Sequence, residues 1–164
     1  ADLAVSAPLD RMIVFQRGGS IIPKQERRRR STQAMSTDPY SLVVALDSRA
    51  MASGELFMDD GSSYNYLKGA HVLRRFIYRD YILTASSVSG SGTGFTGEDA
   101  VVERILILGH LGPSPTHAIV RQKPSDGTGT KVDVAVDSAS GVVFVRQPNV
   151  CAGKGEWSVR LAIP

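Results

Sequence analysis

Apolar residues along the chain come in short runs, and Gly, Ser, Asp and Pro interrupt them. No long stretch repeats apolar positions at the three- to four-residue spacing of a helix face. Residues 131–137 alternate instead, with Val132, Val134 and Val136 on one face, which is typical of a strand half buried in a sheet. The pattern predicts an all-β fold, namely an antiparallel β-sandwich of about ten strands.

Turn residues separate the expected strands. Residues 59–61 (DDG) predict a hairpin, because Asp and Gly tolerate positive φ, and residues 79–80 predict a second one. The stretches 86–99 and 123–130 are rich in small and polar residues and are expected to be long exposed loops. The strands expected from the pattern are residues 12–16, 21–22, 41–46, 55–58, 64–67, 72–78, 81–86, 102–108, 118–121, 131–137, 142–146 and 157–163.

Composition agrees with a globular domain and excludes several other classes. The chain has 164 residues, of which 42% are hydrophobic, enough for one domain or for one domain and part of another. No apolar run is long enough to span a bilayer, so a membrane partner is not expected. The only cysteine, Cys151, cannot form an internal disulfide and leaves the cellular compartment open. Because the first residue is Ala1 rather than Met, we expect the chain to begin inside a longer polypeptide.

Charge is concentrated in one place. The net charge is +3, and residues 11–30 hold seven of the 19 Lys and Arg residues against a single acid, Glu26. The four consecutive residues Arg27, Arg28, Arg29 and Arg30 are the strongest feature of this stretch. They could bind a polyanion, but no nucleic-acid-binding motif accompanies them, and a nucleic acid partner is not expected. We favour an interface in which the guanidinium groups pair with carboxylates or carbonyls of a neighbouring domain.

No set of residues predicts chemistry within this chain. Glycoside hydrolysis needs two carboxyl groups facing each other across a cleft, whereas Asp59 and Asp60 are adjacent and lie in a predicted turn. His71, His110 and His117 follow no nucleophile motif and no metal-ligand spacing. We therefore predict no catalytic residue, no metal site and no cofactor.

Aromatic residues gather in one part of the chain, at Tyr64, Tyr66, Tyr78 and Tyr81, with Phe76 among them. Exposed aromatic rings can stack on sugar rings, so a carbohydrate-binding face is one hypothesis. Aromatic pairs packed inside a sheet protein are the commoner arrangement, and we favour it.

Five segments occur in an order that resembles glycoside hydrolase family 31. They are residues 8–23 (PLDRMIVFQRGGSIIP), 38–47 (DPYSLVVALD), 54–61 (GELFMDDG), 74–76 (RRF) and 103–109 (ERILILG). The resemblance is strong up to Gly109 and rests on strand rhythm beyond it. The basic stretch at 27–31 makes the chain most similar to the endoplasmic-reticulum glucosidase II branch of the family, in its catalytic α subunit.

The resemblance implies a retaining α-glycosidase built on a TIM barrel that is followed by proximal and distal β-domains. Residues 1–19 would be the last strand of the proximal domain, and residues 20–164 the distal C-terminal domain. The two catalytic aspartates would lie on the barrel, before residue 1, so no catalytic residue is assigned here. The implied reaction removes α-1,3-linked glucose from N-glycans in the endoplasmic reticulum lumen. The implied partners are the upstream barrel and a β subunit.

Overall fold

The computed structural model describes residues 4–90, 94–123 and 127–164. In this part of the chain the only helical elements are two single 3-10 turns, η1 (Gln33–Met35) and η2 (Asn65–Lys68), so the all-β prediction is confirmed. The described part contains no helix long and apolar enough to cross a bilayer. The strands are β1 (Ser20–Lys24), β2 (Tyr40–Ala45), β3 (Ala52–Met58), β4 (Val72–Arg79), β5 (Ile82–Gly90), β6 (Val101–Leu108), β7 (His117–Gln122), β8 (Thr130–Val132), β9 (Val134–Val136), β10 (Val143–Cys151) and β11 (Trp157–Ala162).

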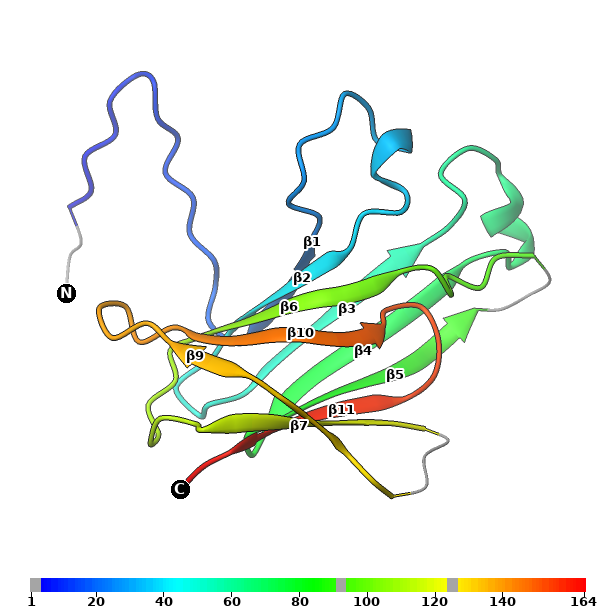
Figure 1. Ribbon diagram of the computed structural model, residues 1–164. Helices are drawn as coiled ribbons and strands as arrows, with labels where there is room; N and C mark the ends of the chain where they lie inside the picture. Colours follow the sequence, from blue (N-terminus) through cyan, green and yellow to red (C-terminus); the bar gives the residue numbers. More distant parts are fainter. Residues whose placement is uncertain (1–3, 91–93, 124–126) are drawn as a thin grey trace.

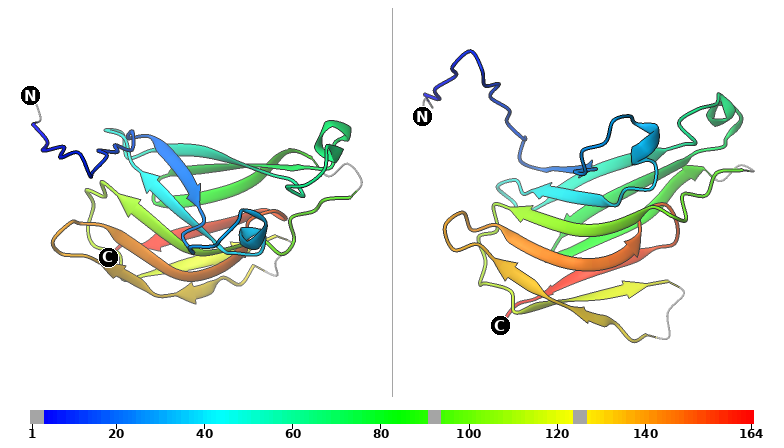
Figure 2. Two further views of the ribbon diagram at one scale, coloured as in Figure 1. Left: turned by 90° about the horizontal axis from the view of Figure 1, so that it is seen from above. Right: turned by 45° about the horizontal axis from the view of Figure 1, so that its top comes forward.

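These strands form one sheet rather than two, in the order β8-β7-β11-β5-β4-β3-β1-β2-β6-β10-β9. Most neighbours are antiparallel, but β1 pairs with β3 and β2 pairs with β6 in parallel. The sheet curls until β10 lies close to β7 and β8, which gives a nearly closed, barrel-like shape (Figures 1 and 2). The strictly antiparallel, two-sheet arrangement is therefore not observed. Alternation along a strand tells which face a residue occupies, but not which strand lies beside it.

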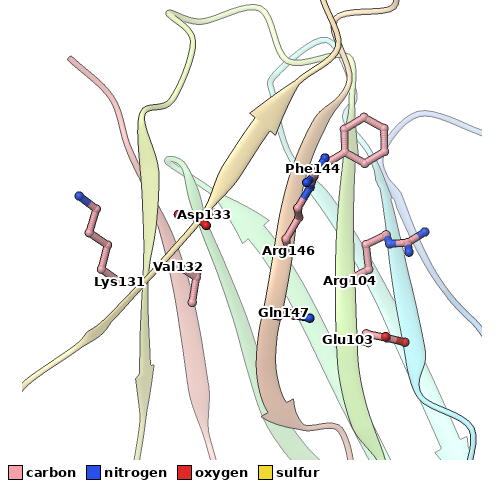
Figure 3. A pocket seen from close by; sticks show the side chains of 8 residues that line it. All are labelled: Glu103, Arg104, Lys131, Val132, Asp133, Phe144, Arg146 and Gln147. Carbon is pink, nitrogen blue, oxygen red and sulfur yellow. The ribbon is translucent and has the colours of Figure 1, made fainter.

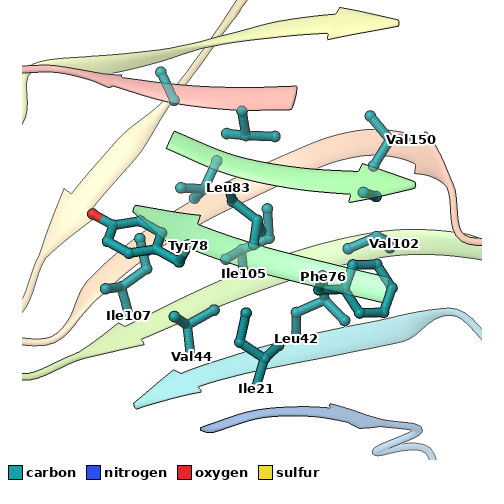
Figure 4. Packing of buried hydrophobic residues seen from close by; sticks show 14 of the residues in the cluster. Ile21, Leu42, Val44, Phe76, Tyr78, Leu83, Val102, Ile105, Ile107 and Val150 are labelled. Atoms are coloured by element: carbon teal, nitrogen blue, oxygen red, sulfur yellow. The ribbon is translucent and has the colours of Figure 1, made fainter. Parts of the chain in front are cut away.

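The core lies inside the curl of the sheet, as Figure 4 shows. Burial alternates along strand β4: Val72, Arg74, Phe76 and Tyr78 are buried, and the residues between them are more exposed. The Phe76 ring packs against Trp157, with the ring centroids 5.9 Å apart. Burying these large side chains removes apolar surface from water and is the main force that holds the curled sheet together.

One close approach between strands needs glycine. Gly54 on β3 lies directly beside the backbone of Ile21 on β1, and a Cβ atom at Gly54 would collide with the Ile21 carbonyl group. The absence of a side chain at this position allows the parallel contact between β1 and β3.

Several predicted boundaries are corrected. Residues 64–67, predicted as a strand, form the η2 turn instead, so residues 59–61 open a longer loop rather than a tight hairpin. The second predicted hairpin, between β4 and β5, is confirmed, with positive φ at Asp80 and Tyr81. Strand β5 runs on to Gly90, into the stretch predicted as a loop from 86 to 99; residues 91–93, like 124–126 of the second predicted loop, lie outside the described residues.

The first segment of the chain stands apart from the sheet. Residues 4–19 extend away from it (Figure 1), and the expected strand at 12–16 has no strand partner within the described residues. Leu9, Met12, Val14 and Phe15 are largely exposed. Only the end of the segment is attached to the sheet.

Candidate functional site

The loop that joins β1 to β2, residues 25–39, carries the four arginines. The guanidinium group of Arg29 makes two charge-assisted hydrogen bonds to Asp38, from Nε to Oδ2 over 2.9 Å and from Nη2 to Oδ1 over 2.7 Å. Asp38 is only 3% exposed. These hydrogen bonds from Arg29 hold the pKa of the Asp38 carboxyl group below its ordinary value. We call this pair the Asp38 clasp, because it ties the arginine stretch to the far end of the loop.

A second set of bonds closes the base of the same loop. The amide nitrogen of Gln25 donates to the carbonyl oxygens of Met35 and Asp38, over 2.9 and 3.0 Å. The backbone N–H of Asp38 also donates to the carbonyl of Met35, over 2.9 Å. The loop is thus held by side chains at both ends, which restricts its conformation more than its polar composition indicates.

Ion pairs then connect the loop to strand β6. Arg27 lies 3.4 Å from Glu103, measured from Nη2 to Oε2, and Arg104 lies 3.6 Å from Glu26, measured from Nη1 to Oε2. The hydroxyl of Ser41 on β2 donates to the same Glu26 oxygen over 3.1 Å. The loop and the first residues of β6 therefore form one continuous charged surface.

A groove of about 770 Å³ continues this surface, as Figure 3 shows. On one side stands the short link between β8 and β9, and on the other lie β6 and β10. Strand β10 is bulged here: its register against β6 shifts after Arg146, and Gln147 and Asn149 adopt positive φ. The groove is lined by Glu103, Arg104, Lys131, Val132, Asp133, Phe144, Arg146 and Gln147.

The four tyrosines of the sugar-binding hypothesis do not form one surface. Tyr64 is 78% exposed and lies beside Tyr66, with ring centroids 6.3 Å apart. Tyr78 is 1% exposed in the core, and Tyr81 packs edge-on against His110 at the turn between β4 and β5. These tyrosines are close in the sequence but far apart in the structure, because β4 carries the chain from one end of the sheet to the other.

Comparison with known proteins gives a consistent result over nearly the whole chain, although no family model matches it. The chain is 40% identical over 153 residues to the probable glucan 1,3-alpha-glucosidase of Oryza sativa subsp. japonica. That alignment covers 90% of the chain and 16% of the rice protein. Among solved structures, the glucosidase II alpha subunit in its Tris-bound form superimposes with a TM-score of 0.83 at 27% identity, over 96% of the chain and 18% of the subunit.

The chain is homologous to a segment of the glucosidase II α subunits of glycoside hydrolase family 31. A heterodimeric complex of endoplasmic-reticulum glucosidase II, with the catalytic subunit and the binding domain of the regulatory subunit, also matches with a TM-score of 0.81. In that complex the identity is 28%, over 95% of the chain and 18% of the matched chain. The chain thus spans less than a fifth of these glucosidase relatives.

The acidic residues considered for catalysis have local structural roles in this chain. The carboxylate of Asp59 accepts the backbone N–H of Gly61 over 2.9 Å. Asp60 accepts hydrogen bonds from the backbone N–H groups of Ser62 and Ser63, over 3.0 and 2.9 Å. A hydrogen bond from the Ser63 hydroxyl, together with these two backbone bonds, lowers the pKa of Asp60. Both aspartates shape the turn between β3 and η2. Within residues 4–90, 94–123 and 127–164, no three His, Cys, Asp or Glu side chains are placed to hold a metal ion.

Arg74 is a buried charged residue that the sequence analysis missed. Arg74 on β4 is fully buried, and its guanidinium group donates from Nη1 to the Ser87 hydroxyl over 2.7 Å and from Nη2 to the Gly155 carbonyl. Burial lowers the pKa of Arg74. The available signal was its position, because Arg74 shares the inward face with Val72 and Phe76 in an alternating strand.

Proposed function

We propose that the chain is a non-catalytic C-terminal β-domain of a glucosidase II-like α-glucosidase, and that it supports the catalytic barrel of that enzyme. The observation that carries the proposal is the homology: the chain aligns over at least 90% of its length with enzymes of which it spans less than a fifth. The turn roles of Asp59 and Asp60 agree with chemistry located elsewhere in the polypeptide.

The exposed first segment supports the proposed division at residue 19. Residues 4–19 present apolar side chains to solvent, among them Met12, Val14 and Phe15. Among the described residues, their backbone is hydrogen-bonded to the backbone of the sheet only at Gly19, which bonds to Ala45 and Ser53. An extended apolar segment of this kind gains most by adding to the edge of another sheet. We therefore assign residues 1–19 to the last strand of a proximal β-domain and residues 20–164 to the distal domain.

The proposed reaction of the whole enzyme is removal of α-1,3-linked glucose from N-glycans in the endoplasmic reticulum lumen. Two observations support it: the rice relative is named a probable glucan 1,3-alpha-glucosidase, and a matching glucosidase II α subunit was solved with α3-Glc2 bound. A regulatory β subunit is the proposed partner, since a matching structure is a complex with the binding domain of such a subunit.

Hydrolysis of p-nitrophenyl α-glucoside tests the non-catalytic role. The purified chain is expected to release no p-nitrophenol, whereas a longer polypeptide that contains the barrel and this chain hydrolyses the substrate. Turnover by the purified chain that survives further purification would overturn the proposal.

The division at residue 19 has its own test. Replacing Met12, Val14 and Phe15 with Ser should leave the melting temperature of the isolated chain unchanged, because these side chains are exposed in it. In the longer polypeptide the same replacements should lower the melting temperature, since they would remove buried apolar surface there. An unchanged melting temperature in the longer polypeptide would contradict the strand assignment.

A carbohydrate-binding role is the second candidate, now reduced to one pair of rings. Tyr64 and Tyr66 lie together with Phe57, which makes an edge-on contact with Tyr66 at 6.4 Å. Titration calorimetry with gluco- and manno-oligosaccharides decides this role. Heat of binding that disappears in Tyr64→Ser supports it, and a flat signal at millimolar ligand dismisses it.

A further inference from the structure

The charged surface made by loop 25–39, β6, β10 and the β8–β9 link has a specific pattern of ion pairs. The acids on the loop side are already engaged: Asp38 with Arg29, and Glu103 with Arg27. Glu26 likewise lies near Arg104. Half of the arginine stretch is thus used inside the chain and is not available to a partner.

Four cations of the same surface have no acidic partner. Arg28, Arg30, Lys131 and Arg146 form no ion pair with any residue that the structure describes. Arg28, Arg30 and Lys131 are exposed, and so is Arg146. Against these four cations, Asp133 is the one groove acid that forms no ion pair among the described residues.

The position of Arg146 makes this excess costly for the isolated chain. Arg146 on β10 is directly opposite Arg104 on β6 in the sheet register. Like charges that face each other across two strands are destabilising. Among the described residues, only Arg104 of this pair has a carboxylate within ion-pair distance, that of Glu26. An external carboxylate at Arg146 would relieve the repulsion.

We propose that these four cations form the docking surface for an acidic polypeptide segment, whose carboxylates pair with Arg28, Arg30, Arg146 and Lys131. The Asp38 clasp and the Gln25 bonds hold the arginine loop in place, so little order must be imposed when the partner binds. The planar guanidinium group suits a carboxylate because it can donate two parallel hydrogen bonds.

The rest of the groove favours a polypeptide over a nucleic acid or a sulfated glycan. Glu103 and Asp133 line the groove among the cations, and the Phe144 ring provides an apolar wall. A chain with a charge on every unit would bring anions against both acids. A polypeptide can place carboxylates only where cations lie and an apolar side chain near Phe144.

Binding of a synthetic peptide in which serines separate the glutamates and one leucine is included for the Phe144 wall, measured by fluorescence anisotropy at low salt, tests the proposal. The double variant R28S/R30S is expected to weaken binding by about tenfold, the effect of losing two exposed ion pairs, and K131S/R146S by a similar factor. The charge-matched control is R121S/R160S, which removes two exposed arginines from β7 and β11. This control should bind nearly as well as the unaltered chain.

Three outcomes would overturn the proposal. One is an equal loss in R121S/R160S, because binding would then follow net charge alone. Another is unaltered binding in both test variants. The third is tighter binding of poly-L-glutamate, heparin or a single-stranded RNA than of the serine-spaced peptide, with the same variants affected, which would make the surface a general polyanion site. None of these results bears on hydrolysis, so the enzymatic proposal is tested separately.

Discussion

Arginine side chains occupy two contrasting environments in this molecule, the closed interior beneath β4 and the exposed loop 25–39. Arg74 is fully buried and donates to a hydroxyl and a carbonyl, with no carboxylate in ion-pair distance among the described residues. Arg28 and Arg30 are exposed, and Arg29 lies between them on the Asp38 clasp. The same guanidinium group therefore contributes differently to stability at the two places. Desolvation dominates at Arg74, and the geometry of ion pairing dominates in the loop.

The interior arginine connects parts of the fold that the sheet alone does not join. Arg74 lies on β4, Ser87 on the neighbouring β5, and Gly155 in the turn between β10 and β11. Its Nε atom is buried and has no hydrogen-bond partner among the described residues. Burying a guanidinium group costs free energy. The change in the free energy of unfolding when Arg74 is replaced therefore measures how much this bridge of hydrogen bonds to Ser87 and Gly155 contributes.

The largest expected effect follows from that bridge. Arg74→Ala should lower the free energy of unfolding by about 3 kcal/mol, because it opens a cavity and leaves the Gly155 carbonyl without its donor. Urea denaturation followed by the fluorescence of Trp157, which packs near this site against Phe76, measures the change.

The neighbouring arginine is the matched control for this experiment. Arg75 points to the other face of β4 and pairs with Glu55 over 2.8 Å in an exposed ion pair. Arg75→Ala should cost at most about 0.5 kcal/mol. If both variants lose similar stability, burial is not what separates the two environments.

The Asp38 clasp should give a smaller effect that depends on pH. The pKa of Asp38 is lowered in the folded chain, chiefly by hydrogen bonds from Arg29, relative to an ordinary value of 3.8. Its stabilisation is therefore complete above that ordinary value and is lost as the pH falls through the lower, folded pKa. Asp38→Asn should remove this part of the acid dependence and lower stability at neutral pH by less than Arg74→Ala does.

Thermal unfolding between neutral pH and pH 2, in parallel for the unaltered chain and Asp38→Asn, measures this dependence. The control is Asp80→Asn, which alters an exposed ion pair with Arg79 at a turn. If the melting temperatures of Asp38→Asn and of the unaltered chain fall in parallel as the pH is lowered, the Asp38 clasp does not stabilise the loop.

The two environments also differ in how far the sequence predicts them. Residues 72–78 are predicted as a strand, and the two-residue period of a strand puts Val72, Phe76 and Tyr78 on one face, which is the buried one. The same alternation places Arg74 inside, although its charge favours the surface. The parallel contacts of β1 and β2 could not be predicted from the pattern, since alternation does not tell which strand lies beside another. The contact of β1 with β3 also needs the close approach at Gly54.

The sequence predicts that the loop is charged, but not which of its arginines form ion pairs within the chain. Four identical residues in a row carry no information about which ones turn inward; Asp38 decides that, by binding Arg29 from nine positions away. The groove could not be predicted from the sequence either. Its lining residues come from segments as distant as Glu103 and Arg146, which the pairing of β6 and β10 brings together.

The smallest expected effect concerns a second polar group on the inner face of β4, the hydroxyl of Tyr78. It is buried and has no hydrogen-bond partner among the described residues, and burial raises the pKa of Tyr78 to about 12. Tyr78→Phe should therefore leave stability unchanged or raise it by up to about 1 kcal/mol, since no hydrogen bond is lost. Urea denaturation at neutral pH measures this difference.

Alkaline pH sharpens the same comparison. A folded pKa above the ordinary 10.0 of tyrosine means that the folded chain holds this proton more tightly than the unfolded chain does. Stability contributed by Tyr78 is thus complete below pH 10 and is lost as the pH rises toward 12, so Tyr78→Phe should gain on the unaltered chain across this window. If Tyr78→Phe is instead less stable at neutral pH, the hydroxyl has a partner, and the inner face of β4 tolerates polar groups only when they are bridged, as Arg74 is.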